Sequence, residues 1–197
     1  IIIRITAKAV DATAATVMLD EGEAALRERL EKYIYGVDDE TLASYLGKKL
    51  LKQHKTISFA ESCTGGLASN LVTDIAGSSE YLIGSIVTYT NEAKHNLLKV
   101  KEETLNAYGA VSEETALEMA QGVRKLFGSD FGVGITGNAG PGGSEGKPVG
   151  LVYIALADKA NVWVRKINAA YGNDRERVRN AATLAALDLI RRYAISS

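Results

Sequence analysis

From Thr56 onward, short apolar runs alternate with longer helical stretches, and this alternation constrains the fold more than any other feature. Each apolar run ends in Gly, Ser, Thr or Asn, as strands do where they enter loops. Such a rhythm is typical of an α/β domain. We predict strands over Thr56–Ala60, Ile83–Tyr89, Phe131–Thr136, Val149–Ala157 and Val162–Ile167. We predict helices over Gly65–Ile75, Glu92–Leu98, Glu113–Phe127 and Asp174–Tyr193, with Ser112 as a helix cap.

The last two predicted strands are joined by the short connection Asp158–Asn161. A connection of this length suits an antiparallel hairpin, whereas parallel neighbours need a long crossover. The sheet should therefore be mixed. We expect a three-layer α/β/α sandwich around this mixed sheet, preceded by a short N-terminal βα fragment.

The first 36 residues differ in pattern from the rest. Apolar residues alternate with polar ones over Ile1–Ala9, which predicts a strand, and Ala14–Tyr35 reads as a helix stopped by Gly36. One strand and one helix have too little area to bury, so we expect them to belong to a module completed elsewhere or by a partner chain. The absence of a leading Met suggests a start inside a longer polypeptide. A second unit should begin near the acidic residues 38–40, followed by a helix through Lys52.

Composition narrows the classes of function. The formal net charge is −1, so no overall field attracts nucleic acid or an acidic membrane surface. Cys63 is the single cysteine and has no partner for an internal disulfide, and no apolar run approaches the length of a membrane span. We expect a cytoplasmic protein without a membrane or nucleic-acid partner.

Polar residues follow three predicted strands, at positions 61–64, 88–91 and 136–138. In α/β sheets the carboxyl ends of strands open onto the ligand crevice. The three segments should therefore converge on one site. The alternative is that their Ser and Thr side chains only cap helices.

The first of these segments has the composition of a nucleophile loop. Ser62 stands before the paired glycines Gly65 and Gly66, which allow a sharp turn, and the first N–H groups of the next helix would point at a ligand. The two histidines lie in lysine-rich helical stretches, so a Ser-His-Asp triad is not expected. Lys94 remains as the candidate base, and it must be desolvated to act near neutral pH. A rival hypothesis makes Cys63 the nucleophile, because thiols attack more readily than hydroxyls.

Residues 137–148, the Gly-rich segment, contain five glycines and both prolines of the chain. The segment lacks the spacing of a Walker A loop, and Lys147 is followed by Pro148 instead of Ser or Thr. Two interpretations remain open: a flexible surface crossover, or a backbone cradle for an anionic ligand.

Five sequence blocks together resemble the C-terminal domain of the competence/damage-inducible CinA family. They are AESCTGG at 60–66, VTYTNEAK at 87–94, GAVSEE at 109–114, GNAGPGG at 137–143 and KPVG at 147–150. The resemblance implies a deamidase domain over residues 37–197 and identifies residues 1–36 as a fragment of the KH-type connecting domain that precedes it. It also implies hydrolysis of nicotinamide mononucleotide to nicotinate mononucleotide and ammonia.

Carried over residue by residue, the resemblance makes Ser62 the nucleophile, Lys94 its base and Tyr89 a third member that relays or orients the proton. The substrate contacts that it implies are Glu61, Thr64, Gly65, Asn91, Thr136, Gly137, Gly140 and Arg175. Arg175 is the expected phosphate ligand, with Arg177 and Arg179 left open as alternatives, because a guanidinium fork suits a phosphate.

The chain departs from the family at Asn138, where the family has isoleucine. This change could alter the packing of the loop or its contacts with the substrate ring. The resemblance implies no metal, no cofactor and a homodimer. An alternative of another class is a non-catalytic nucleotide-binding or competence-related interaction module, although residues 1–36 contain neither a G-x-x-G clamp nor a basic-aromatic stripe.

Overall fold

The computed structural model describes residues 2–169 and 174–194. The chain divides into two compact units, residues 1–41 and residues 42–197. The second unit contains every site residue predicted from the sequence.

The first unit consists of an extended segment, helix α1 (Ala12–Leu30) and the 3-10 turn η1 (Glu31–Tyr33). Asp11 caps α1 by accepting the N–H of Ala14. The predicted strand over Ile1–Ala9 is wrong for the described residues 2–9, which pair with no other segment. A strand depends on hydrogen bonds to a neighbouring strand, and Ile2 is 94 % exposed. The identity of this unit as a fragment of a connecting domain stays a prediction.

The second unit is built on one five-stranded sheet in the order β2-β1-β3-β4-β5. Its strands are β1 (Ile57–Glu61), β2 (Leu82–Val87), β3 (Phe131–Gly137), β4 (Leu151–Ala157) and β5 (Val162–Asn168). The first three strands run parallel, and β4 and β5 are antiparallel to their neighbours. The mixed sheet and its terminal hairpin are thereby confirmed.

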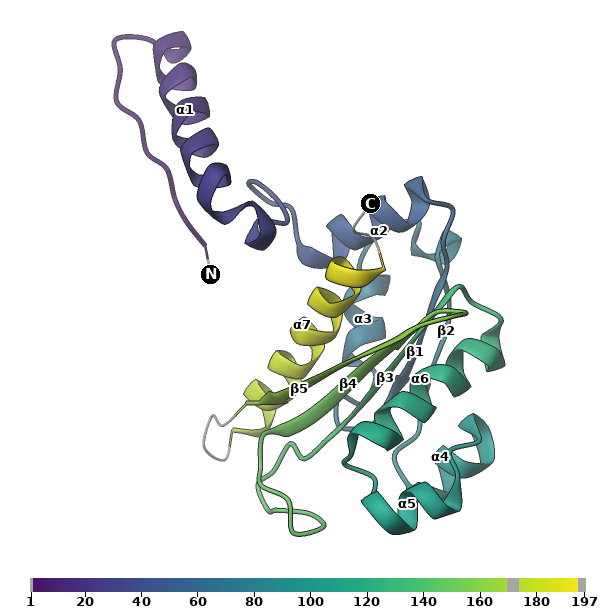
Figure 1. Ribbon diagram of the computed structural model, residues 1–197. Helices are drawn as coiled ribbons and strands as arrows, with labels where there is room; N and C mark the ends of the chain where they lie inside the picture. Colours follow the sequence, from purple (N-terminus) through teal and green to yellow (C-terminus); the bar gives the residue numbers. More distant parts are fainter. Residues whose placement is uncertain (1, 170–173, 195–197) are drawn as a thin grey trace. The chain divides into compact units, whose positions relative to one another are not determined.

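Helices cover both faces of the sheet, which confirms the three-layer α/β/α prediction (Figure 1). One layer comprises α4 (Asn91–Leu98), α5 (Glu102–Tyr108) and α6 (Glu113–Phe127). The other comprises α2 (Leu42–Lys52), α3 (Leu67–Thr73) and α7 (Arg175–Tyr193), and a 3-10 turn η2 (Ser78–Glu80) precedes β2. Helix α5 was not predicted, because seven residues with two buried positions give no clear period. No helix in the described ranges is long and apolar enough to cross a membrane.

The central strand β3 shows how the sequence sets the spacing of the layers. Its residues alternate, with Val133 and Ile135 in the core beneath α7 and with Gly132 and Gly134 facing α6. A Cβ atom on Gly132 would lie 2.2 Å from a carbonyl oxygen of α6, and one on Gly134 would lie 2.4 Å from another. The glycines therefore let α6 lie close against β3.

The strand order also places the ligand crevice. From β1 the chain crosses to β2 on one side, and it then returns to β3 on the other side. In open α/β sheets, ligands bind outside the carboxyl ends of strands where the order reverses in this way. The crevice should thus lie beyond the ends of β1 and β3, where Ser62 and Thr136 stand.

Candidate active site

Ser62 and Lys94 meet at the carboxyl end of β1. Ser62 is the first residue after that strand, and its backbone N–H donates to the carbonyl oxygen of Ile135 at the end of β3. Lys94 lies in the first turn of α4, which Thr90 caps. The Nζ atom of Lys94 lies 3.2 Å from the Oγ atom of Ser62, within hydrogen-bond distance. The predicted pair is brought together across 32 residues of sequence.

The environment of Lys94 favours its neutral form. The side chain is 1 % exposed, and its other polar partner is the carbonyl oxygen of Thr88 at 2.8 Å. Burial lowers the pKa of Lys94 to about 8, and electrostatic interactions with Cys63 and Glu145 act in the opposite direction. A neutral lysine has two N–H donors and one lone pair. It can therefore donate to Thr88 and accept the proton of Ser62 at the same time.

Cys63 is the neighbour of Ser62 but has a different environment. Its thiol is buried, and burial raises the pKa of Cys63 to about 12. A thiolate is the reactive form of cysteine, and it is scarce near neutral pH at such a pKa. The thiol packs instead with the apolar core between the sheet and α7. The structure therefore favours Ser62 over the rival nucleophile.

We expect Cys63→Ala to keep the predicted deamidase activity within about twofold of that of the unsubstituted protein, because the thiol only fills core volume. The substitution should lower the melting temperature slightly. Steady-state ammonia release, with a thermal melt of each protein, measures both effects. Loss of turnover in a folded variant would return Cys63 to the mechanism.

Glu61 occupies the place at which an anionic ligand was expected. Its fully buried carboxylate accepts the N–H groups of Gly66, Ala68 and Ser69 at 2.9–3.0 Å, and the Ser69 hydroxyl at 2.8 Å. The start of α3 thus binds the protein's own carboxylate. Glu61 holds the nucleophile loop to α3, and its carboxylate has no free face for a substrate.

Thr64 and Gly65 complete this loop. Thr64 is fully buried, its carbonyl oxygen accepts from Arg179 at 2.7 Å, and its hydroxyl is a buried group with no hydrogen-bond partner among the described residues. Gly65 is exposed, with a φ of +62° that a side chain rarely adopts. The turn therefore depends on glycine at this position.

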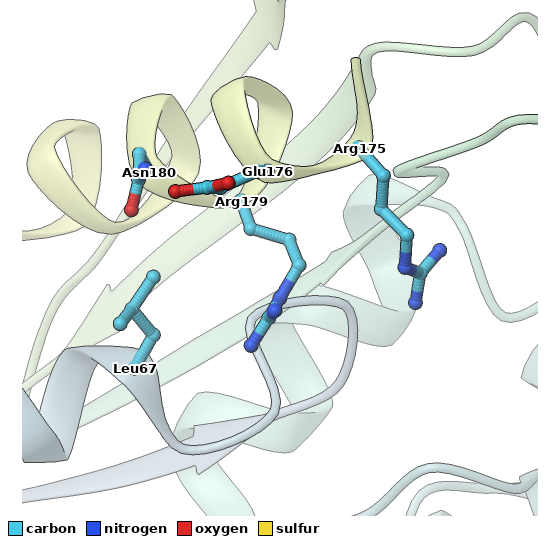
Figure 2. A pocket seen from close by; sticks show the side chains of 5 residues that line it. All are labelled: Leu67, Arg175, Glu176, Arg179 and Asn180. Atoms are coloured by element: carbon cyan, nitrogen blue, oxygen red, sulfur yellow. The ribbon is translucent and has the colours of Figure 1, made fainter. Parts of the chain in front are cut away.

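The three candidate arginines lie in the first turns of α7 and differ in their contacts. Arg175 donates to the carbonyl oxygen of Gly140 at 2.6 Å and to the hydroxyl of Tyr89 at 2.8 Å. Arg177 is exposed and pairs with Asp174 at 3.2 Å. Arg175 and Arg179 both line a cavity of about 390 Å³, in which Arg179 extends toward the loop before α3 (Figure 2). The geometry favours Arg175 and Arg179 over Arg177 as anion ligands.

Tyr89 lies at the surface and is 60 % exposed. Its hydroxyl accepts from Arg175 rather than bonding to Ser62 or Lys94. In this arrangement Tyr89 belongs to the rim of the site together with Arg175, and a role in moving the proton of Ser62 stays a prediction.

The remaining predicted contacts divide into two groups. Thr136 is buried and donates its hydroxyl proton to the carbonyl oxygen of Ala110 at 2.7 Å, while Gly137 ends β3 and Gly140 carries the carbonyl group bound by Arg175. These residues lie where the Gly-rich segment leaves the sheet. Asn91 is exposed and faces a separate cavity of about 460 Å³ between α4 and α5. The structure does not bring Asn91 into the cavity lined by Arg175.

Two groups at the site were missed by the sequence analysis. The acceptor that orients Lys94 is the backbone oxygen of Thr88, which no side-chain pattern can reveal. The other group is Glu145, which raises the pKa of Lys94. It is the only acidic residue in the Gly-rich segment, and this was the one sequence feature that could have drawn attention to it. Among the described residues, no group of three or more His, Cys, Asp or Glu side chains is placed to hold a metal ion.

Residues 39–194 match the family pattern described as the CinA C-terminal domain. The chain belongs to the CinA family. The sequence resemblance to that family is thus confirmed.

Members of the CinA family from several organisms align with most of the chain. A CinA-like protein of Kosmotoga olearia is 47% identical over 193 residues, which are 98% of this chain and 46% of that protein. A CinA-like protein of Endomicrobium trichonymphae is 52% identical over 168 residues, which are 85% of this chain and 39% of that protein. The chain therefore spans less than half the length of these curated relatives.

Solved CinA structures share the fold. The competence/damage inducible protein CihA from Agrobacterium tumefaciens superposes with a TM-score of 0.74 at 41% identity, covering 81% of this chain and 97% of that one. A CinA superfamily protein from Escherichia coli gives a TM-score of 0.72 at 30% identity, covering 83% and 97%.

The departure from the CinA pattern at Asn138 has a structural role. The Asn138 side chain accepts the N–H of Gly140 at 3.1 Å and donates to the carbonyl oxygen of Lys147 at 3.2 Å. Its backbone also bonds in both directions to Gly150 and Leu151. The amide therefore ties the two ends of the Gly-rich segment together, a task that an isoleucine side chain cannot perform.

Proposed function

We propose that this chain is an amidohydrolase that converts nicotinamide mononucleotide to nicotinate mononucleotide and ammonia. The observation that carries the proposal is the buried Ser62–Lys94 pair, with 3.2 Å between Oγ and Nζ and a lysine pKa of about 8. A hydroxyl beside an amine that is partly neutral is an activated nucleophile. Both residues lie in the region that matches the CinA C-terminal domain. The resemblance to that family is our reason for proposing the carboxamide of this nucleotide as the group attacked.

In the first half of the reaction, neutral Lys94 takes the proton of Ser62 while Oγ forms a bond to the carboxamide carbon. The carbonyl electron pair moves onto oxygen. When the tetrahedral intermediate collapses, the carbon–nitrogen bond breaks and the Lys94 ammonium gives its proton to the departing nitrogen. Ammonia leaves, and the acyl group stays on Ser62 as an ester. One lysine serves first as base and then as acid.

In the second half, Lys94 is neutral again and takes a proton from water as the water oxygen attacks the ester carbon. Collapse of this intermediate breaks the bond to Oγ, and the Lys94 ammonium returns a proton to Ser62. The product leaves as a carboxylate after losing its acidic proton to solvent. The carbonyl oxygen of Thr88 holds Nζ in place throughout, because it bonds to an N–H of Lys94 in either charge state.

The substrate phosphate has two candidate cations. Arg175 and Arg179 line the same cavity, and the protein atoms they now contact are neutral oxygens of Gly140, Tyr89 and Thr64. A phosphate would give either guanidinium a charged acceptor in place of a neutral one. We propose that the phosphate binds between the two arginines and the Gly-rich segment.

Nicotinamide riboside, which lacks the phosphate, should therefore be a much poorer substrate. We expect Arg175→Ala to raise KM for the mononucleotide by about 10- to 100-fold and to change the weak activity on the riboside little. Arg177→Ala, on the exposed side of the same helix, serves as the matched control and should leave both substrates unchanged. Equal efficiency of the parent enzyme on both substrates would contradict the assignment of the phosphate site.

An ammonia-release assay tests the function directly. The mononucleotide should yield ammonia and nicotinate mononucleotide in equal amounts, whereas free nicotinamide and glutamine should yield little. Product identity can be read by chromatography. Absence of turnover on all three compounds by the folded protein would favour the alternative of a non-catalytic interaction module.

A further inference from the structure

Glu145 is the one acidic residue in the Gly-rich segment, and its backbone is strained. Its φ of +56° lies in the left-handed region, which costs a residue with a side chain about 1 kcal/mol or more. Strain of this kind persists only where the surrounding contacts offset it. The contacts of the Glu145 side chain therefore show which interactions offset this backbone strain.

The carboxylate of Glu145 is held by two consecutive backbone N–H groups. It accepts from Ala110 at 2.8 Å and from Val111 at 3.2 Å, in the turn between α5 and α6. The Lys147 ammonium lies 3.3 Å from this carboxylate and donates to the carbonyl oxygen of Tyr108, the last residue of α5. Burial alone would raise the pKa of Glu145, but these N–H groups and Lys147 hold it below the usual value. The carboxylate is therefore charged when the segment is docked.

The turn that receives Glu145 is shaped for it. Gly109 leaves the necessary space, since a Cβ atom there would lie 2.2 Å from Oε2 of Glu145. On its other side the turn is fixed to the sheet, because the hydroxyl of Thr136 donates to the carbonyl oxygen of Ala110. The turn thus connects the middle of the Gly-rich segment to the end of β3.

The docked segment is also part of the active-site wall. Its first residues bear the Gly140 carbonyl group that Arg175 binds. The charge of Glu145 reaches Lys94 and raises the pKa of that lysine. Among the described residues, Cys63 and Glu145 are the charged or titratable groups that act on the pKa of Lys94 in this way. The contact of Glu145 with the turn is therefore linked both to Arg175, through the Gly-rich segment, and to Lys94, through the charge of the carboxylate.

We propose that Glu145 is a positioning residue, a latch that fastens the Gly-rich segment to the turn at residues 109–111 and so sets the wall of the site between Arg175 and Lys94. Its effect on catalysis rests on the proposed function, but the latch itself does not. The segment is therefore not a free surface crossover, because the N–H groups of Ala110 and Val111 in the turn bind its carboxylate.

Two variants remove the latch to different degrees. Glu145→Gln keeps the shape but offers a donor where the carboxylate had an acceptor, and Glu145→Ala removes both contacts. Glu103→Gln, on the exposed side of α5, makes the same chemical change away from the segment and serves as the control. Amide hydrogen exchange followed by NMR reports Ala110 and Val111 individually, without any substrate.

We expect exchange at Ala110 and Val111 to rise about tenfold or more in both Glu145 variants and to stay unchanged in Glu103→Gln. The value of kcat/KM should fall by about tenfold, with most of the change in KM, because the loose wall binds substrate less well. In Glu145→Gln the acid limb of the pH profile of kcat/KM should also move to lower pH, since a negative charge near Lys94 has gone. A purely structural role would not move that limb.

Unchanged exchange at both amides, in a folded Glu145→Ala protein, would overturn the latch. Changed exchange with kcat, KM and the pH profile all within twofold of the parent would overturn its positioning role. If the parent protein releases no ammonia from the mononucleotide, the proposed function fails, and the exchange measurement still decides whether Glu145 holds the segment.

Discussion

Ser62→Ala is expected to lower kcat for nicotinamide mononucleotide by about 10⁴-fold or more, with the fold retained. In the proposed mechanism the substitution removes the atom that forms the acyl-enzyme. The neighbouring Cys63 thiol does not replace it, since it is buried with a pKa of about 12. The hydroxyl is small, and its loss leaves the backbone bond from Ser62 to Ile135 intact. Binding of the substrate should change much less than turnover, because the arginines are untouched.

Ser58→Ala provides a matched control for this prediction. Ser58 lies in β1, the strand that Ser62 follows. Its side chain is also buried, and its hydroxyl bonds to Ser129 rather than to the site. The control loses a buried hydrogen bond, which costs about 1 kcal/mol, but it should keep its turnover. Turnover of Ser62→Ala within a few-fold of the parent, measured by ammonia release on the folded protein, would remove Ser62 from the mechanism.

Lys94→Arg is expected to lower kcat/KM by about 10³-fold although the positive charge is kept. Arginine does not deprotonate at the pH of the assay, so it cannot accept the proton of Ser62. At pH 7 a lysine of pKa about 8 is neutral in about one molecule in ten, against about one in three thousand at the ordinary pKa of 10.5. In the proposed mechanism, this difference in the neutral fraction is what the burial of Lys94 contributes.

The same argument predicts the pH dependence. The pKa of Lys94 is lowered, so its active, neutral form appears as the pH rises, and kcat/KM for the parent enzyme should increase through a single ionisation near pH 8. Lys101→Arg, an exposed substitution beyond the end of α4, should leave the profile unchanged. Lys94→Met keeps much of the side-chain volume without a charge, and circular dichroism checks that each variant is folded.

Near wild-type turnover in a folded Lys94→Arg protein would show that the residue supplies charge alone. A proton acceptor would then have to be sought elsewhere. A value of kcat/KM that stays constant between pH 6 and pH 9 in the unsubstituted protein would independently contradict the role of Lys94 as the proton acceptor.

The sheet and most of its helices follow from local patterns in the sequence. All five strands of the second unit lie within two residues of their predicted ends, because buried strands are short apolar runs closed by turn-forming residues. Ser112 caps α6 as predicted by accepting the N–H of Thr115. The prediction of a strand over Ile1–Ala9 was wrong. Alternating apolar and polar residues form a strand only where a neighbouring strand supplies hydrogen bonds, and no strand pairs with residues 2–9.

The composition of the nucleophile loop and the blocks shared with the CinA family pointed to Ser62 and Lys94 as candidates. Only the tertiary structure decided their environment, since the lowered pKa of Lys94 arises from burial among elements far apart in the chain. It also showed that Glu61 binds the start of α3 and that Tyr89 faces Arg175. Sequence patterns specify which groups are present, whereas desolvation and hydrogen-bond partners depend on how the folded chain surrounds each group.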